Sequence, residues 1–395
     1  MSGRERAAIA VVACAVHLAL LAPTVGQEGG VLKTDFGPEA VAIEYGALPY
    51  SDEDLEYPPL SIPVIVGPAL ITDGLDAYNE AFEWEMLAVD LAIVLLLALA
   101  LQPGRARVIG ALVVYTAAIV ALSGIVFAGS DIDEAPLALS RFDLVPALLV
   151  LAAVLAREAG RSATWSALLS VGAGVKAFPL VLFPALVRGE RSPRRVAIAA
   201  AIPLLVCGAI VLALGDEFFS VVSYHAERGL QIESLAATPL EIAGLDDTSV
   251  AAQYGSGSFN FVGPGAELAR ALSIAALVFL YGLLLWAGWR NPKISHLELS
   301  TALLAALVVL SPVLSPQFLF WLLPISAAAY GLDLRNVVLV GAFVMTQLML
   351  QQYARIVVDF DPEFVWRLAG RNALLLLYLV LVCVPVLRAG ASLRT

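Results

Sequence analysis

A succession of apolar stretches, each long enough to cross a bilayer, constrains the fold of this chain more than any other feature. A membrane-spanning helix needs about 20 apolar residues. Barrel strands instead alternate over ~10 residues, a pattern that the sequence does not show. We therefore expect an all-α polytopic membrane protein, one domain over residues 1–395, with about 11 transmembrane helices. Ten expected spans lie near residues 7–26, 86–102, 107–128, 141–157, 193–214, 267–289, 297–313, 316–331, 335–352 and 372–389.

Composition narrows the possible functions. The chain is 60% hydrophobic and 14% charged, whereas soluble domains carry roughly 25% charged residues. A net charge of −11 argues against a nucleic acid partner. Neither a phosphate-binding loop nor a Gly-rich nucleotide motif occurs, so a site for ATP or a nucleotide sugar is not expected. Cys14, Cys207 and Cys383 lie in apolar spans without metal-ligand spacing, and we expect no disulfide.

The basic residues predict the orientation in the membrane. Short loops that hold Lys and Arg read as cytoplasmic, which places both chain ends inside the cell. The long polar segments 27–60 and 215–266 are then outside. Arg4 and Arg6 before an apolar run also resemble a signal peptide, but no small-x-small cleavage site follows. We therefore expect an uncleaved first helix in a multi-pass protein of the cell membrane.

Residues 162–189 conflict with this map. Basic residues flank the segment on both sides, yet its length suits a single span, which would place one basic cluster outside. A broken or re-entrant helix pair removes the conflict, with Gly172, Gly174 and Pro179 as breaking residues and Lys176 at the tip. Irregular backbone at membrane depth is tolerated only where it is buried in protein or lines a cavity. The segment is therefore a candidate site.

Other unusual polar residues fall on the same outer side, and each has a simpler explanation. Asp90 lies in the outer half of a span, and charges at depth usually face an interior cavity. Arg141 and Asp143 begin another span, where they would otherwise pair with each other or cap the helix. If residues 218–234 are helical, His225 and Arg228 share a face. The alternative there is an amphipathic surface helix.

Two further outer segments complete this set. The first outer loop holds eight carboxylates, among them Asp35, and its simplest interpretation is a solvated acidic loop. The segment 311–324 breaks the helical pattern with three prolines and places Gln317 and Trp321 four residues apart. An interfacial aromatic belt with a kinked connection would explain these two residues equally well.

Several of these stretches together resemble a known family. The first outer loop, with TDF, GALPY and EYPPL, resembles that of C-type (GT-C) glycosyltransferases that use polyprenyl-phosphate sugars. Within that superfamily the chain looks most like the bacterial polyprenyl-phosphate-mannose mannosyltransferases of glycosyltransferase family 87. Supporting stretches are SRFDLVPALLV (140–150), GVKAFPLVLFPAL (174–186), YHAERGLQIES (224–234) and SPQFLFWLLP (315–324).

The resemblance implies an activity and a catalytic residue. It implies a GT-C-like bundle that transfers a sugar, mannose by preference, from a polyprenyl-phosphate donor to a glycolipid or glycan acceptor outside the cell. Asp35 would be the catalytic base of an inverting transfer. Phe36 and Gly37 follow Asp35, so the Asp-x-Asp pair of many relatives is missing, and we expect no metal and no other cofactor.

The resemblance also suggests which residues would hold the substrates. Lys176 and Arg228, followed by Arg141 and His225, are the candidates for the donor phosphate. The candidates for the sugar or acceptor are Tyr50, Tyr57, Gln317, Trp321 and Glu233. Two other classes of function stay open at this point: a transporter or flippase for lipid-linked sugars, and a non-catalytic membrane scaffold.

Overall fold

The structure is a computed structural model. It describes residues 1–26, 36–50, 55–101, 104–122, 137–215, 217, 228–245, 250–255, 258–350 and 361–392. Asp35 and His225 lie outside the described residues.

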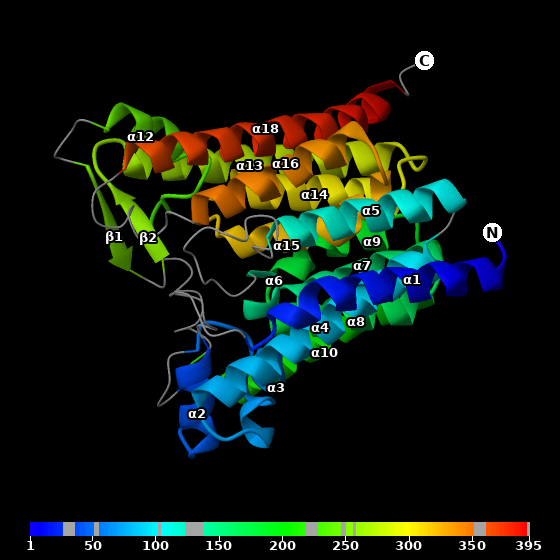
Figure 1. The fold of residues 1–395 in the computed structure, drawn as a ribbon. Helices are drawn as coiled ribbons and strands as arrows, with labels where there is room; N and C mark the ends of the chain where they lie inside the picture. The colour runs from blue at the N-terminus through cyan, green and yellow to red at the C-terminus, as the bar shows by residue number, and fades with distance from the viewer. Residues whose placement is uncertain are drawn as a thin grey trace.

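Long helices run side by side in one bundle (Figure 1). They are α1 (Gly3–Leu21), α4 (Leu75–Ala100), α5 (Arg105–Ala121), α7 (Leu144–Glu158), α8 (Ser162–Val175), α10 (Pro193–Leu214), α13 (Ala266–Arg290), α14 (His296–Leu310), α15 (Leu319–Tyr330), α16 (Leu334–Leu350) and α18 (Pro362–Ala391). Both chain termini lie at the same end of this bundle, which we call the terminal end.

Shorter elements gather at the opposite end, which we call the loop end (Figure 1). These are α2 (Gly37–Glu44), α12 (Thr238–Ala243), β1 (Ala251–Gly255) and β2 (Ser258–Val262). The remaining short helices are η1 (Ala22–Thr24), η2 (Pro59–Ser61), α3 (Ile62–Val66), η3 (Ala69–Ile71), α6 (Leu137–Ser140), η5 (Phe178–Leu182), α9 (Phe183–Val187) and η6 (Pro316–Phe318).

Four helical segments are long and apolar enough to cross a membrane: Gly3–Thr24, α10, α13 and α18. Their outer faces carry large exposed apolar side chains. On α10, for example, Leu204, Leu205 and Leu212 are each more than two-thirds exposed. Such surfaces need an apolar solvent, so the chain is a helical membrane protein. Other helices of the bundle are shorter or more polar, as in α4, which carries Asp90.

A β-hairpin departs from the all-α expectation. Strands β1 and β2 pair antiparallel, with Tyr254 opposite Phe259. Phe261 is buried, and its backbone N–H donates to Leu230 O. The sequence does not predict the hairpin because residues 258–261 alternate between polar and apolar over only four positions, which is too short to stand out inside a polar loop.

The break predicted within residues 162–189 is confirmed. Helix α8 ends at Val175, Lys176 is extended (φ −154°, ψ 129°), and the chain continues through η5 and α9. Arg157, near the C-terminal end of α7, donates to Leu186 O at 2.6 Å. Since α7 leads directly into α8, this contact shows that the chain returns to the end from which α8 starts.

Gly172 and Gly174 were predicted to break the helix, and this prediction is wrong. Gly172 and Gly174 are helical residues of α8 and do not break it. A Cβ on Gly174 would lie 2.4 Å from Cδ1 of Leu60, and one on Gly172 would lie 3.3 Å from Cβ of Leu149. These glycines allow neighbouring elements to approach α8 closely.

Asp90 is part of a buried polar network that joins three helices. His17 Nδ1 of α1 lies 2.6 Å from Asp90 Oδ2 of α4. The Tyr115 hydroxyl of α5 donates to Asp90 Oδ1 at 2.8 Å. His17 Nε2 lies 2.8 Å from Thr116 Oγ1. The Asp90 carboxylate, costly inside a bilayer, is therefore satisfied by side chains from both neighbouring helices.

Candidate functional site

The helix break places a lysine beside a carboxylate. Lys176 Nζ donates to Asp143 Oδ1 at 2.7 Å, and the two residues are 9% and 1% exposed. Asp143 stands at the N-cap of α7, yet its side chain makes no capping hydrogen bond. Its partner is therefore neither the helix terminus nor Arg141, the two partners that the sequence suggested.

Aromatic rings surround the Lys176 ammonium. It lies 5.1 Å from the ring centroids of Tyr57 and Phe142, 5.4 Å from that of Phe318 and 5.3 Å from that of Trp321. Such contacts stabilise a cation that is partly removed from water. One carboxylate and four aromatic rings thus stabilise the positive charge of Lys176 at a position that is largely shielded from water.

Trp321 connects to the same carboxylate. Its indole N–H donates to Asp143 Oδ1 at 2.6 Å. Phe178 stacks on the indole with centroids 3.9 Å apart, and Phe318 stacks on it at 4.1 Å. Two rings this close and nearly parallel must occupy opposite faces. A sugar would therefore reach only the edge of Trp321.

Phe36 anchors the start of α2 to this cluster. The Phe36 ring is buried and lies 5.2 Å from Phe142 and 5.7 Å from Tyr57, measured between centroids. Asp35 precedes it directly in the sequence. Further along the loop, Tyr50 has a positive φ of 70°, and its hydroxyl donates to Tyr57 O at 2.6 Å.

The segment that begins at Arg228 lies against the segment that contains Glu56 and Tyr57. Arg228 Nη2 is 3.8 Å from Glu56 Oε2, beside Tyr57. Gln231 donates from its backbone to Pro312 O at 2.9 Å and from its amide to Ser315 Oγ at 3.2 Å. Gln231 is thus fixed over the segment that leads into η6, which contains the half-buried Gln317.

Arg141, a further candidate for the donor phosphate, has different surroundings. Arg141 is buried and donates to Ser140 O at 3.0 Å. Burial is the main cause that raises the pKa of Tyr57, and the negative charges of Glu56 and Asp143 raise this pKa further. The positive charge of Arg141 opposes the rise. The Tyr57 hydroxyl therefore stays protonated near neutral pH.

Glu233 is held by α18. Arg371 Nη1 lies 3.4 Å from Glu233 Oε2, and Asn372 donates to Glu233 O at 3.2 Å. Both members of this ion pair are at most 1% exposed. These contacts tie residues 233–238 to α18, and Glu233 has partners quite unlike those of Lys176.

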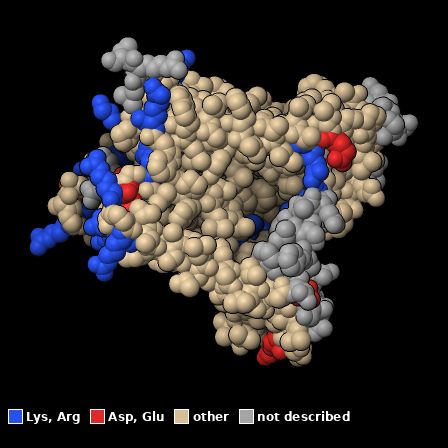
Figure 2. All heavy atoms as spheres, turned by 180° about the vertical axis from the view of Figure 1, so that it is seen from behind, with Lys and Arg blue, Asp and Glu red and all other residues tan. Residues whose placement is uncertain are grey.

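Figure 2 shows a hollow in one face of the molecule, with Lys or Arg surface visible inside it. On the same face, most Lys and Arg gather at the terminal end, and most of the visible Asp and Glu surface lies toward the loop end. Among the described residues, no group of three His, Cys, Asp or Glu side chains is arranged to hold a metal ion.

Sequence reasoning missed several residues of this site. From the sequence, a helix cap or a pair with Arg141 is the simplest explanation of Asp143, and nothing in the sequence singles out Phe36, Phe142 or Phe318. The available signal was the carboxylate of Asp143 at the start of an apolar span, since such groups are expensive unless paired.

A comparison with protein families finds a match. A model described as glycosyltransferase family 87 matches residues 55–316. The matched range includes Glu56, Arg141, Asp143, Lys176 and Arg228, and it begins after Asp35. No curated protein matches the chain.

Proposed function

Because the chain belongs to glycosyltransferase family 87, we propose that this membrane glycosyltransferase moves mannose from a polyprenyl-phosphate donor to a hydroxyl of a glycolipid or glycan. The observation that carries this proposal is the buried Lys176 ammonium at the break between α8 and η5. A cation at such a break is costly to keep and suits a phosphate ligand.

A lipid-linked donor fits the surroundings of this cation. Lys176 is enclosed by aromatic rings at the edge of an apolar bundle, where a polyprenyl chain can stay in hydrocarbon while its phosphate reaches the ammonium. Arg228 and Arg141 are the next cations along the outer loops. Tyr50, Tyr57, Gln317 and the edge of Trp321 are the side chains we assign to the sugar and the acceptor.

The proposed reaction is a single displacement with inversion. The acceptor oxygen attacks the anomeric carbon, and its proton passes to the carboxylate of Asp35. The bond from that carbon to the phosphate oxygen breaks, and its electron pair leaves with polyprenyl phosphate. The phosphate gains one negative charge, so a cation fixed beside it lowers the barrier. We assign this role to Lys176.

The anchoring of the first loop supports Asp35 as the base. Phe36 packs on Phe142 and Tyr57, whose rings face the Lys176 ammonium. Consecutive Cα atoms are about 3.8 Å apart, so the backbone beside Asp35 is tied to the phosphate site. Phe36, the residue next to the candidate base in the sequence, and Lys176, the candidate phosphate ligand, then contact the same two rings.

Asp143 is a positioning residue in this scheme. It accepts from Lys176 and from Trp321 on one oxygen, so it fixes both side chains at once. A carboxylate beside the ammonium also keeps the empty site electrically balanced. On donor binding, the phosphate joins or replaces Asp143 as the partner of Lys176.

The loop end would face the outside of the cell. The basic side chains gather at the terminal end (Figure 2), and basic loops stay in the cytoplasm. Both termini would then be cytoplasmic, and transfer would take place on the extracytoplasmic side.

The test is transfer of radiolabelled mannose from polyprenyl-phosphate mannose to glycolipid acceptors by the purified protein in lipid. We expect transfer by the wild type and by Glu44→Gln, which changes another carboxylate of the same loop, and none by Asp35→Asn. NMR of the product gives the anomeric configuration. Transfer by Asp35→Asn at the wild-type rate would remove Asp35 as the base. Transfer from polyprenyl-phosphate arabinose alone would change the assigned sugar.

A further inference from the structure

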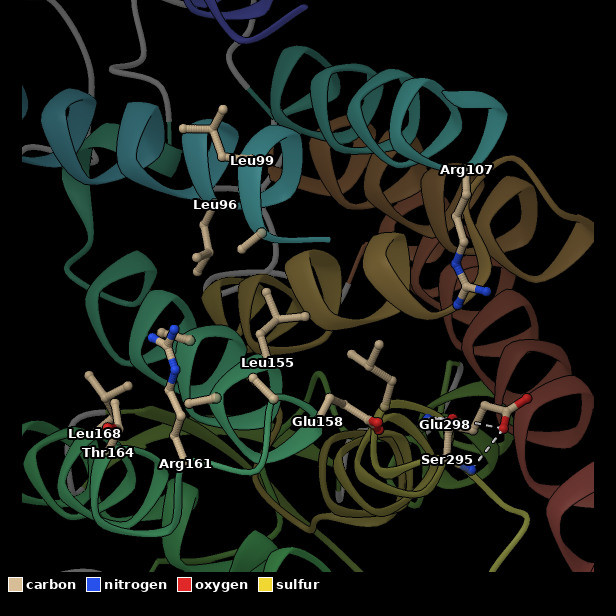
Figure 3. A pocket seen from close by; sticks show the side chains of 15 residues that line it. Leu96, Leu99, Arg107, Leu155, Glu158, Arg161, Thr164, Leu168, Ser295 and Glu298 are labelled. Carbon is tan, nitrogen blue, oxygen red and sulfur yellow. Dashed lines mark hydrogen bonds between the residues drawn. The ribbon is translucent and has the colours of Figure 1, made fainter. Parts of the chain in front are cut away.

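A second cavity lies at the terminal end, away from Lys176. It has a volume of about 830 Å³ and is bounded by α4, α7, α8 and the start of α14 (Figure 3). Helices α7 and α8 connect the two regions: α7 begins beside Asp143 and ends at Glu158, and α8 begins after Arg161 and ends before Lys176. The nearest lining residues, Ala152 of α7 and Leu168 of α8, are 9 and 8 residues from Asp143 and Lys176, which corresponds to about 12–14 Å along a helix.

One side of the cavity is apolar. Leu96 and Leu99 of α4, Leu155 of α7 and Leu168 of α8 line this side, and in Figure 3 the Leu99 side chain points away from the other three. Leu99 is 48% exposed on the outside of the bundle, so this wall continues onto a surface that faces hydrocarbon. The volume lies within the range of cavities that bind small ligands, and its apolar wall favours a hydrocarbon chain.

The opposite side is polar, but most of its groups already have partners. Glu158 accepts the backbone N–H of His296 at 2.8 Å. Glu298 accepts the Ser295 hydroxyl at 2.8 Å and so completes the cap of α14. Arg107 donates to Ala328 O at 3.1 Å, near the end of α15. These three charges are used to satisfy helix ends.

Arg161 is the exception. It lines the cavity on the side of Leu168 and is exposed (Figure 3). Within the described ranges, its side chain has no hydrogen bond or ion pair. A cation at the rim of an apolar cavity, at the level of the basic loops, complements an anion attached to a hydrocarbon chain.

We propose that this cavity binds a membrane phospholipid, with one acyl chain against Leu96, Leu155 and Leu168 and its phosphate beside Arg161. The site is separate from the donor site and does not depend on the proposed reaction. A water-soluble ligand would meet mainly leucines and polar groups that are already paired. A phospholipid places its acyl chain against the leucines and its phosphate beside Arg161. Because it fills the gap between α4, α7 and α8, it also supports the two helices next to Asp143 and Lys176.

The test is photo-crosslinking in vesicles that contain a phosphatidylglycerol with a diazirine on its acyl chain, followed by peptide mapping. We expect labelling concentrated on residues 96–100 and 152–168. Ala156→Phe, which places a ring in the cavity, reduces that labelling several-fold. Ala201→Phe on the exposed face of α10 is the matched control and leaves it unchanged. Labelling at the same density on the lipid-facing surface of α13, and unaltered by Ala156→Phe, overturns the proposal.

A second experiment tests whether Arg161 binds the phosphate of the lipid. One basic residue near a membrane surface contributes about fivefold in binding. Arg161→Ala therefore lowers labelling by phosphatidylglycerol about fivefold, whereas Arg194→Ala, an exposed arginine outside the cavity, does not. A diazirine diacylglycerol without phosphate is insensitive to Arg161→Ala. Equal loss with both probes would contradict the assignment of Arg161 to the phosphate. Displacement by inorganic phosphate would identify a free anion as the ligand.

Discussion

Lys176 and Asp143 are 33 residues apart in the sequence, and their charged atoms lie 2.7 Å apart inside the protein. The pair joins the break after α8 to the start of α7. It has two separable consequences: the charges must balance for the protein to be stable, and the ammonium must be present for a phosphate to bind.

The first prediction separates these two consequences. Lys176→Met leaves a buried carboxylate without its cation, and breaking such a pair costs about 3–5 kcal/mol. The double variant Lys176→Met/Asp143→Asn removes both charges and keeps an oxygen that accepts from Trp321. We expect it to recover most of the stability while transfer stays below detection. Thermal unfolding and the mannose transfer assay measure the two effects. Wild-type transfer by the double variant would exclude Lys176 from the reaction.

The second prediction concerns the hydrogen bond from Trp321 to Asp143. Trp321→Phe keeps an aromatic ring between Phe178 and Phe318 but removes the N–H donor. Hydrogen bonds to charged groups contribute about 1.5–3 kcal/mol, so we expect transfer to fall roughly 10- to 100-fold while the protein stays folded. Trp321→Ala also removes the stacking and lowers the melting temperature strongly. If the Phe variant is as active as the wild type, the orientation of Asp143 does not depend on Trp321.

A third prediction tests close packing at the helix break. Gly174→Ala places a methyl group 2.4 Å from Leu60 Cδ1 and 2.8 Å from Leu60 Cγ, and such overpacking typically costs about 1–3 kcal/mol. Gly208→Ala in α10 meets no atom within 4 Å and gains about 1 kcal/mol in helix propensity. Melting temperatures should therefore shift in opposite directions. Adding Leu60→Ala to Gly174→Ala should restore part of the loss.

The fourth prediction is a pH dependence at the loop end. Glu241 of α12 is buried, and burial raises the pKa of its carboxyl well above the ordinary 4.5, with Glu233 adding to the rise and Arg371 opposing it. The folded protein holds a proton there that the unfolded chain releases. The contribution of Glu241 to stability therefore declines as the pH rises from about 4.5 toward the raised pKa.

Glu241→Gln removes this titration. We expect the variant to melt at a higher temperature than the wild type at pH 8 and at nearly the same temperature at pH 4. Glu267→Gln on α13, whose side chain is 88% exposed, is the control and should follow the wild type at both values. A difference that does not change with pH would show that Glu241 keeps its charge in the folded protein.

The sequence was sufficient for features that depend on local chemistry. The length of the apolar stretches predicted the helical membrane bundle. The basic residues on both sides of residues 162–189, which one span would place on opposite sides of the membrane, predicted the break near Lys176. Residue types could not show why position 174 is glycine, because the reason is the close approach of Leu60, which is far away in the sequence. The partner of Asp143 was also unpredictable, since Arg141 is near in sequence whereas Lys176 is near only after α7 and α8 have packed.

The network around Asp90 has a consequence for how the protein is made. In the sequence, His17 precedes Asp90 and is synthesised before it, whereas Tyr115 and Thr116 are synthesised after it. While α4 leaves the translocon, its carboxylate has only one of its final partners, and an incompletely paired charge is expensive in hydrocarbon. We expect stable insertion of α4 to wait for synthesis of α5. Nascent chains arrested just before and just after residues 105–121 would show this as a change in membrane retention of α4.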